Sequence, residues 1–158
     1  MGQSFTHAIF DLVANPEIIQ PLREEIEPLI KEEGWQKSTL MKMKKLDSFI
    51  KESLRLNMVS GGMDTIGYTL TLVATFRKVI KPFTFSNGVT VTPGETLASP
   101  AGAIHLDDAV YDDAYKFDAF RFSKMRERDG DSAKVHSVNT STEFLSFGHG
   151  EHAWYSAR

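Results

Sequence analysis

The segment Phe147-Gly148-His149-Gly150-Glu151-His152-Ala153 has the composition of a loop that closes around a bound group. Its two glycines allow backbone N–H groups to approach a ligand closely, and His152 can add a positive charge. Most glycine-rich loops only turn the chain, so this segment decides the fold only together with other motifs. Three such motifs precede it.

The first motif is Lys51-Glu52-Ser53-Leu54-Arg55, on a stretch whose apolar residues recur at helical spacing. Glu52 and Arg55 are three residues apart, so they share one face of the predicted helix and can form an ion pair. Taken alone, this pattern is typical of an exposed ion pair that contributes little to stability.

The second motif, Phe117-Asp118-Ala119-Phe120-Arg121-Phe122, places one cation among aromatic residues. An arginine in such surroundings stacks on the rings or is held by a carboxylate, because its guanidinium keeps its charge when buried. The third motif is the run from His105 to Tyr111, in which we expect His105 to be structural rather than a metal ligand.

In this order, the motifs resemble those of the cytochrome P450 family, from about Ser4 to Ala153. Glu52 and Arg55 are similar to the Glu-x-x-Arg of its K helix, and Arg121 with Phe122 to the end of its Pro-Glu-Arg-Phe segment. The resemblance implies an α+β fold, mainly α with a small β-sheet, running from the end of the I helix to the haem-binding loop. It also implies that Glu52, Arg55 and Arg121 form a buried structural triad.

The resemblance implies haem as the cofactor, held in the family by a cysteine thiolate. This sequence has no cysteine, and Trp154 occupies the expected position of that ligand, where an indole N–H offers no lone pair to a metal. We therefore assign no metal ligand and no catalytic residue, and expect the chain as written to be inactive even after a Trp154→Cys substitution. The positions expected around the haem are Phe147, Gly148, Gly150, His152 and, as a propionate partner, Arg77.

Intact relatives are expected to be monooxygenases of the endoplasmic reticulum membrane, in fungal secondary metabolism. Their expected partners are a flavoprotein reductase and an apolar small-molecule substrate. The net charge of −3 gives no reason to expect nucleic acid. No apolar run approaches the roughly 20 residues that span a bilayer. A fragment without an anchor would have an unknown or cytoplasmic location.

The whole chain, residues 1–158, is expected to be the carboxyl-terminal portion of one domain. Residues 1–57 are predicted to be helical, 71–100 to form a β-hairpin region, and 101–158 to hold the meander and the haem loop. Residues 58–70 are an atypical insertion, longer than a compact connection requires. One hypothesis is that this insertion and the tail 154–158 are translated intron or frame errors; a genuine Gly-rich surface loop is the alternative.

Local signals refine these boundaries. Asn15 and Pro16 predict a helix N-cap and first position, and Gly34 predicts the end of that helix. Pro21 and Pro28 predict a bend or break inside it. Ser86-Asn87-Gly88 predicts a hairpin turn. The composition of residues 123–142 predicts a mobile loop, whose basic residues are solvated or meet a reductase: Lys124, Arg126 and Arg128.

Two other functions remain open. His149, Glu151 and His152 could form a non-haem metal site, since all three can ligate zinc or iron. A glycine-rich loop is, however, a poor rigid scaffold for three ligands, and no His-Glu-x-x-His spacing is present. The second alternative is a non-catalytic pseudoenzyme fragment.

Overall fold

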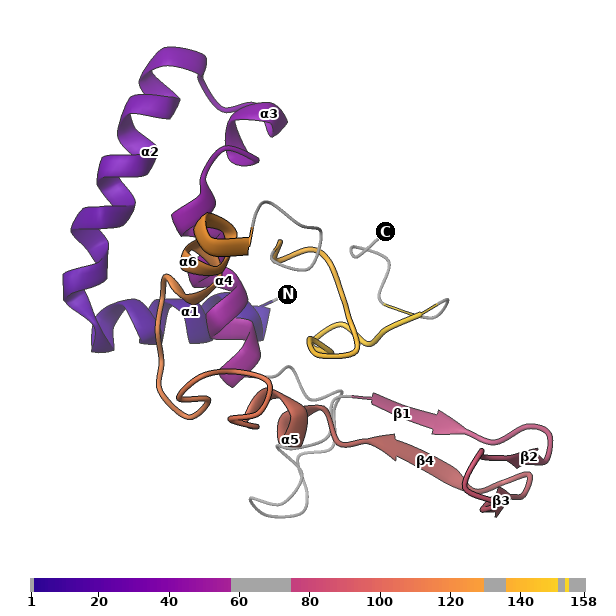
Figure 1. Ribbon diagram of the computed structural model, residues 1–158. Helices are drawn as coiled ribbons and strands as arrows, with labels where there is room; N and C mark the ends of the chain where they lie inside the picture. Colours follow the sequence, from indigo (N-terminus) through magenta and orange to yellow (C-terminus); the bar gives the residue numbers. More distant parts are fainter. Residues whose placement is uncertain (1, 58–74, 130–135, 151–152, 154–158) are drawn as a thin grey trace.

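The structure is a computed structural model that describes residues 2–57, 75–129, 136–150 and 153 (Figure 1). The expected insertion at 58–70 and the residues Glu151, His152 and Trp154 lie outside the described residues. The described part contains helices and two small antiparallel sheets. This confirms the predicted α+β class.

Three elements form the amino-terminal layer: α1 (Gly2–Ala14), the 3-10 helix η1 (Pro16–Ile18) and α2 (Ile19–Glu33). Asn15 occupies the N-cap position of η1 with Pro16 after it, as predicted, but its side chain does not cap the helix, because its Nδ2 donates to the Asp11 carbonyl at 2.9 Å. The predicted break in α2 is also absent. Pro21 lies in the first turn, where no helical N–H is required, and Pro28 is exposed, so water can bind the carbonyl that its ring leaves free.

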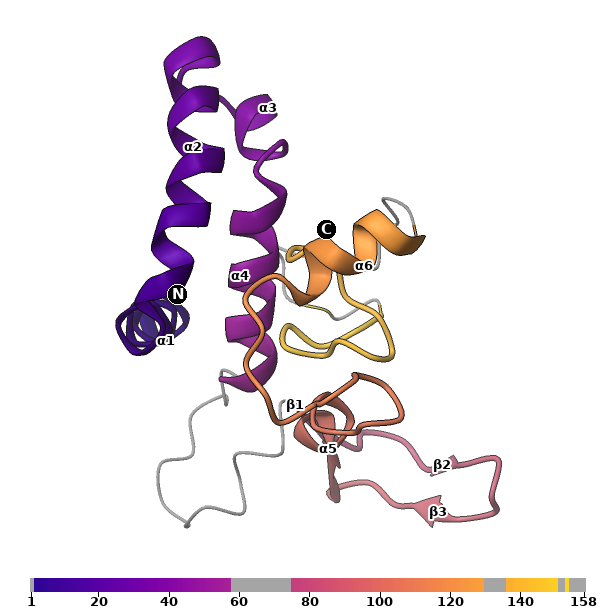
Figure 2. The same cartoon turned by 60° about the vertical axis from the view of Figure 1, so that its left-hand side comes forward.

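The central element is α4 (Lys44–Leu56), reached through the short helix α3 (Lys37–Leu40). Gly34 ends α2 with a φ of 73°, a left-handed conformation that favours glycine. In Figure 2, α4 lies between the α1–α2 layer on one side and α6 on the other. A small apolar core joins these layers, formed by Ile18, Leu22, Phe49 and Ala119.

The strands form a long arm beside the helices (Figure 1). β1 (Thr75–Lys78) pairs antiparallel with β4 (Thr96–Ser99), and β2 (Phe83–Thr84) pairs with β3 (Thr90–Val91). Gly88 has a φ of 87° in the turn between β2 and β3. The hairpin predicted from Ser86-Asn87-Gly88 is therefore confirmed.

The carboxyl-terminal half contains α5 (Ala101–His105) and α6 (Arg121–Asp129). The predicted mobile loop at 123–142 is wrong over its first part, since residues 123–129 belong to α6. Arg126 is buried and forms an ion pair with Asp47 of α4, and the Ser123 N–H donates to Ser48 Oγ at 3.0 Å. Of the basic residues predicted to be solvated, Arg126 is therefore part of the α4–α6 interface.

Candidate functional site

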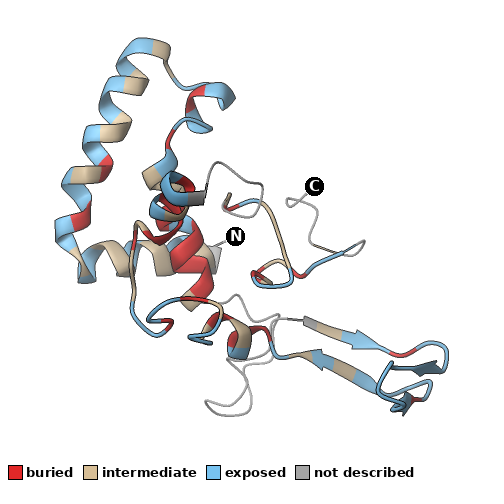
Figure 3. Cartoon of the chain, in the orientation of Figure 1, coloured by how far each residue is buried: buried red, intermediate tan, exposed pale blue. Residues whose placement is uncertain are grey.

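The centre of the protein is the carboxylate of Glu52, which holds two arginines from different parts of the chain. Arg55 donates through Nε to Oε2 and through Nη2 to Oε1, each at 2.8 Å. Arg121 of α6 donates through Nε to Oε1 at 3.1 Å. The exposed fractions of Glu52, Arg55 and Arg121 are 0%, 1% and 9%. The Glu52–Arg55 pair, whose sequence pattern alone is typical of an exposed ion pair, is therefore fully buried. Figure 3 shows α4 as the most buried helix.

Two guanidinium groups face one carboxylate, so the cluster carries one excess positive charge. Backbone carbonyls supply the remaining acceptors. Arg55 donates to the carbonyls of His105 and Ala114, the latter at 2.7 Å, and its guanidinium carbon lies 5.0 Å from the centre of the Tyr111 ring. These contacts hold the segment after α5 against α4. Hydrogen bonds from a charged donor are stronger than neutral ones, so they are well suited to hold two segments together.

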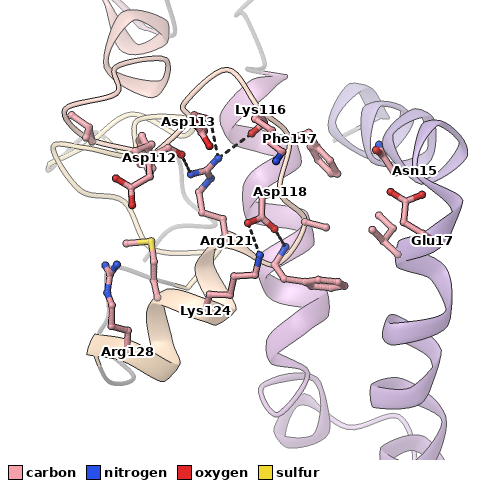
Figure 4. A pocket seen from close by; sticks show the side chains of 16 residues that line it. Asn15, Glu17, Asp112, Asp113, Lys116, Phe117, Asp118, Arg121, Lys124 and Arg128 are labelled. Carbon is pink, nitrogen blue, oxygen red and sulfur yellow. Dashed lines mark hydrogen bonds and ion pairs between the residues drawn. The ribbon is translucent and has the colours of Figure 1, made fainter.

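Arg121 completes the same arrangement from the other side. Its Nη groups donate to the carbonyls of Asp112, Asp113 and Lys116, the last at 2.9 Å (Figure 4). The Asp118 N–H also donates to Glu52 Oε1, at 3.1 Å. A pocket of about 590 Å³ lies between this segment and η1, with Asn15, Glu17 and Ile18 among its lining residues. Two of its charged lining residues, Lys124 and Asp118, pair with each other at 2.7 Å.

His105 connects this cluster to the glycine-rich loop through both ring nitrogens. Nδ1 lies 3.0 Å from the Arg55 carbonyl and must donate to it, while Nε2 accepts the Leu145 N–H at 2.9 Å. This geometry requires the neutral ring. Burial lowers the pKa of His105 to about 4, and the charges of Arg55 and Lys51 act in the same direction. The ring therefore serves as a connector, and neither nitrogen is free to ligate a metal.

The segment before the loop is fixed at several points. Phe144 is buried and stacks on His105 with ring centres 5.4 Å apart. Ser146 Oγ donates to the Leu54 carbonyl of α4 at 2.9 Å, and Tyr111 Oη donates to the Glu143 carbonyl at 2.9 Å. The start of the loop is therefore held against the same helix that carries Glu52 and Arg55.

Lys51, next to Glu52, is another buried cation, and the sequence did not single it out. Its Nζ donates to the His136 carbonyl at 2.9 Å and lies 4.9 Å and 4.3 Å from the ring centres of Phe122 and Phe144. Burial lowers its pKa to about 7, opposed by the charge of Asp47. Lys51 thus ties α4 to α6 and to the loop segment through an ammonium in mostly apolar surroundings.

The folded pKa of Lys51, about 7, lies below its usual 10.5, so the unfolded chain binds more protons between these values. The free energy of unfolding should therefore rise with pH from about 7 to 10.5, by a few kcal/mol. In Lys51→Met this rise should be largely absent, because the titrating group is gone. Urea unfolding at several pH values measures it. Lys44→Met, which removes an exposed lysine of the same helix, should keep the rise; an equal loss in both variants would contradict the assignment.

The loop residues predicted to surround a haem are partly described. Gly148 is buried, and Gly148 and Gly150 have φ values of 73° and 80°, so both positions require the conformational freedom of glycine. Phe147 is half-buried, and His149 is exposed with its Nδ1 3.2 Å from Thr140 Oγ1. Arg77 lies exposed on β1 and donates to the Phe76 carbonyl. Their contacts with a haem stay predictions.

Comparison with known proteins identifies the architecture. A sequence profile described as Cytochrome P450 matches residues 3–153. The chain belongs to the cytochrome P450 family. In this chain, α4 carries Glu52 and Arg55, and α6 carries Arg121, the third member of the buried cluster.

The relatives are fungal P450 proteins. The chain is 45% identical over 150 residues to Cytochrome P450 monooxygenase 151 of Postia placenta, covering 95% of this chain and 28% of that protein. It is 39% identical over 155 residues to Cytochrome P450 monooxygenase prx8 of Penicillium rubens, covering 96% and 27%. The chain thus spans little more than a quarter of the length of these relatives. No helix in the described part of this P450 chain is long and apolar enough to cross a membrane.

The family implies haem, and the donor set of this chain does not fit a haem-thiolate centre. The sequence holds no cysteine, and both nitrogens of His105 are engaged by the backbone. Among the described residues, no group of three or more His, Asp or Glu side chains could hold a metal ion. This sequence therefore contains the buried Glu52 cluster but no cysteine that could supply a thiolate.

Proposed function

We propose that this chain forms the supporting framework beneath the haem-binding loop of a P450 monooxygenase. In the intact protein, the reaction would insert one oxygen atom from O₂ into an apolar small molecule, with electrons from a flavoprotein reductase. Support comes from the monooxygenase names of the relatives and from their fungal origin, which favours a place in secondary metabolism. Location at the endoplasmic reticulum membrane belongs to the same proposal.

The observation that carries the proposal is the buried Glu52 carboxylate with its two arginines. A cluster of this kind costs desolvation energy and contributes most where it fixes one arrangement of segments. Here it fixes α4, the segment 105–121 and, through His105, the start of the glycine-rich loop. Its role is positioning, and the chemistry would belong to the bound cofactor.

For the chain as written we propose no turnover and no haem-thiolate complex, because no residue can supply the sulfur. The purified chain, mixed with haemin, reduced and exposed to carbon monoxide, should give the spectrum of unbound haem. A stoichiometric, protein-bound haem would overturn this part of the proposal. Sequencing the mature transcript gives an independent test: a message encoding cysteine directly after Ala153 would restore the expected ligand of an intact enzyme.

The alternative function is a metal site formed by His149, Glu151 and His152, and it can be distinguished from the haem-related proposal by metal analysis. Zinc or iron bound to the purified chain at one equivalent, and lost in His149→Ala, would favour it over the haem-related proposal. His7→Ala, a histidine of α1 far from this loop in sequence, is the matched control.

A further inference from the structure

Asn87 and Gly88 lie in the turn between β2 and β3, and both residues are exposed. Gly88 has a φ of 87°, and apart from its chain neighbours no atom lies within 4 Å of the position that a Cβ would occupy there. The turn therefore requires glycine for its backbone conformation and leaves the peptide unit after Asn87 open to water and base. Asparagine favours such turns because its side chain can bond the backbone two residues further on, so the turn itself selects this pair.

The side chain of Asn87 makes this bond. Its Oδ1 accepts the Val89 N–H at 3.1 Å. A side-chain carbonyl in this position takes the place of a backbone carbonyl in a turn, which brings its carbon, Cγ, toward the nitrogen of the intervening Gly88. The Val89 N–H also points at the oxygen on which negative charge would develop if a nucleophile attacked Cγ, and a donor in that place stabilises the charge.

The hydrogen bonds of the turn oppose such an attack only weakly. The Gly88 N–H donates to the Phe85 carbonyl at 2.9 Å and must leave this acceptor before the nitrogen can react. Each strand of the hairpin has only two residues, and residues 80–90 are all exposed. Short, exposed hydrogen-bonded elements open locally at little cost in free energy. The Gly88 nitrogen is therefore accessible in the folded chain.

The three other asparagines of the sequence lack this combination of features. Asn15 is followed by a proline, whose nitrogen carries no hydrogen and cannot close a second ring. Asn57 is half-buried, and its Nδ2 donates to the Asp11 carboxylate at 3.0 Å. Asn139 is half-buried and is followed by a β-branched threonine, which crowds the nitrogen. Only Asn87 is both exposed and followed by glycine.

We propose that Asn87 is a self-modifying position, which converts to aspartate and isoaspartate without an enzyme. The Gly88 nitrogen loses its proton to base and attacks Asn87 Cγ. The new N–Cγ bond forms, the Cγ–Nδ2 bond breaks, and Nδ2 leaves as ammonia after gaining a proton from water. Water then opens the resulting five-membered succinimide. Cleavage of the new N–Cγ bond gives aspartate, whereas cleavage of the original peptide bond between the two residues gives isoaspartate, in which the backbone runs through the side chain.

The two products change the hairpin in different ways. Aspartate leaves the backbone as it was and adds one negative charge to the group that accepts the Val89 N–H. Isoaspartate adds one carbon to the backbone between Phe85 and Val89, where the Phe85 N–H donates to the Val89 carbonyl at 2.8 Å. The register that pairs Thr84 with Thr90 should then be lost. The modification is therefore a slow, irreversible change in the shape of the arm.

Peptide mass mapping of the full chain, kept folded at mildly alkaline pH, tests the proposal. A gain of one mass unit should appear in the peptide that contains position 87, with release of an equal amount of ammonia, and not in the peptide that contains Asn139. The rate should rise several-fold with pH, because only the deprotonated nitrogen attacks. Asn87→Gln, which keeps the amide but requires a larger ring, should abolish the gain and leave the rest of the map unchanged.

The products and the folding state provide two further criteria. Isoaspartate should be present beside aspartate, and the two peptides of equal mass separate by reversed-phase chromatography. Direct hydrolysis of the amide gives aspartate alone, so absence of isoaspartate would overturn the succinimide route. The same map recorded in urea measures the reactivity of the unfolded sequence. Conversion at position 87 in urea but not in the folded chain, or equal conversion of Asn87 and Asn139 in the folded chain, would overturn the assignment of this turn as the reactive site.

Discussion

Glu52→Gln is expected to lower the free energy of unfolding by about 3–5 kcal/mol. The substitution keeps the shape of the side chain but removes the only carboxylate that Arg55 and Arg121 share in the described structure. Two guanidinium groups would then lie buried with carbonyl acceptors alone. Since small domains are stable by about 5–15 kcal/mol, the loss should be visible as a large shift in urea unfolding followed by circular dichroism.

Two further variants separate this effect from a generic loss of a hydrogen bond. Glu27→Gln, which alters an exposed acid of α2, should change stability by less than about 0.5 kcal/mol. Adding Arg121→Met to Glu52→Gln should recover part of the loss, because it removes one of the two uncompensated cations. If the double variant instead lost the sum of the two single effects, the shared-charge account of the cluster would be wrong.

The buried cluster shows what the sequence could predict about the site. The helix around Glu52 and Arg55 followed from apolar periodicity, and their contact followed from a spacing of three residues. The carbonyl acceptors could not be predicted, because any residue can supply a carbonyl and only the path of the chain selects His105 or Ala114. The burial of the Glu52–Arg55 pair could not be predicted either, because exposed and buried Glu–Arg pairs have the same local sequence pattern.

Helix α6 shows a different failure. Residues 123–129 are rich in charge and predicted a loop, but Phe122 and Met125 face the second apolar cluster, with Tyr111 and Ala114. Their spacing of three residues was the available signal for a helix. Arg126 can be buried there because it forms an ion pair with Asp47, which is distant in the sequence. The hairpin was easier, because the turn chemistry of Asn87-Gly88 acts within four residues and needs no tertiary partner.

Acidification should destabilise the chain through His105. Its pKa in the folded state, about 4, lies below the usual 6.5, so the unfolded chain binds more protons between these values. The stabilising contribution of the neutral ring is therefore complete above pH 6.5 and is lost as the pH falls through about 4. The total is about 3 kcal/mol, measured as the decrease in the free energy of unfolding over this range.

This pH dependence arises because both hydrogen bonds of His105 require the same neutral tautomer, with the proton on Nδ1. A proton on Nε2 would place a donor against the Leu145 N–H and add a charge beside Arg55 and Lys51, with only Glu52 opposing them. His105→Phe keeps an aromatic ring against Phe144 but has nothing to titrate, so its stability should be lower at neutral pH and much less dependent on pH below 6.5. His7→Phe, at a half-buried position of α1, should retain the acid dependence of the original chain. If His105→Phe retained the acid dependence as well, the acid sensitivity would belong to carboxylates such as Asp118. Burial raises the pKa of Asp118, but the hydrogen bond from Lys124, together with smaller favourable contributions, outweighs this and lowers it. The connection between the Glu52 cluster and the loop would then not depend on a neutral histidine.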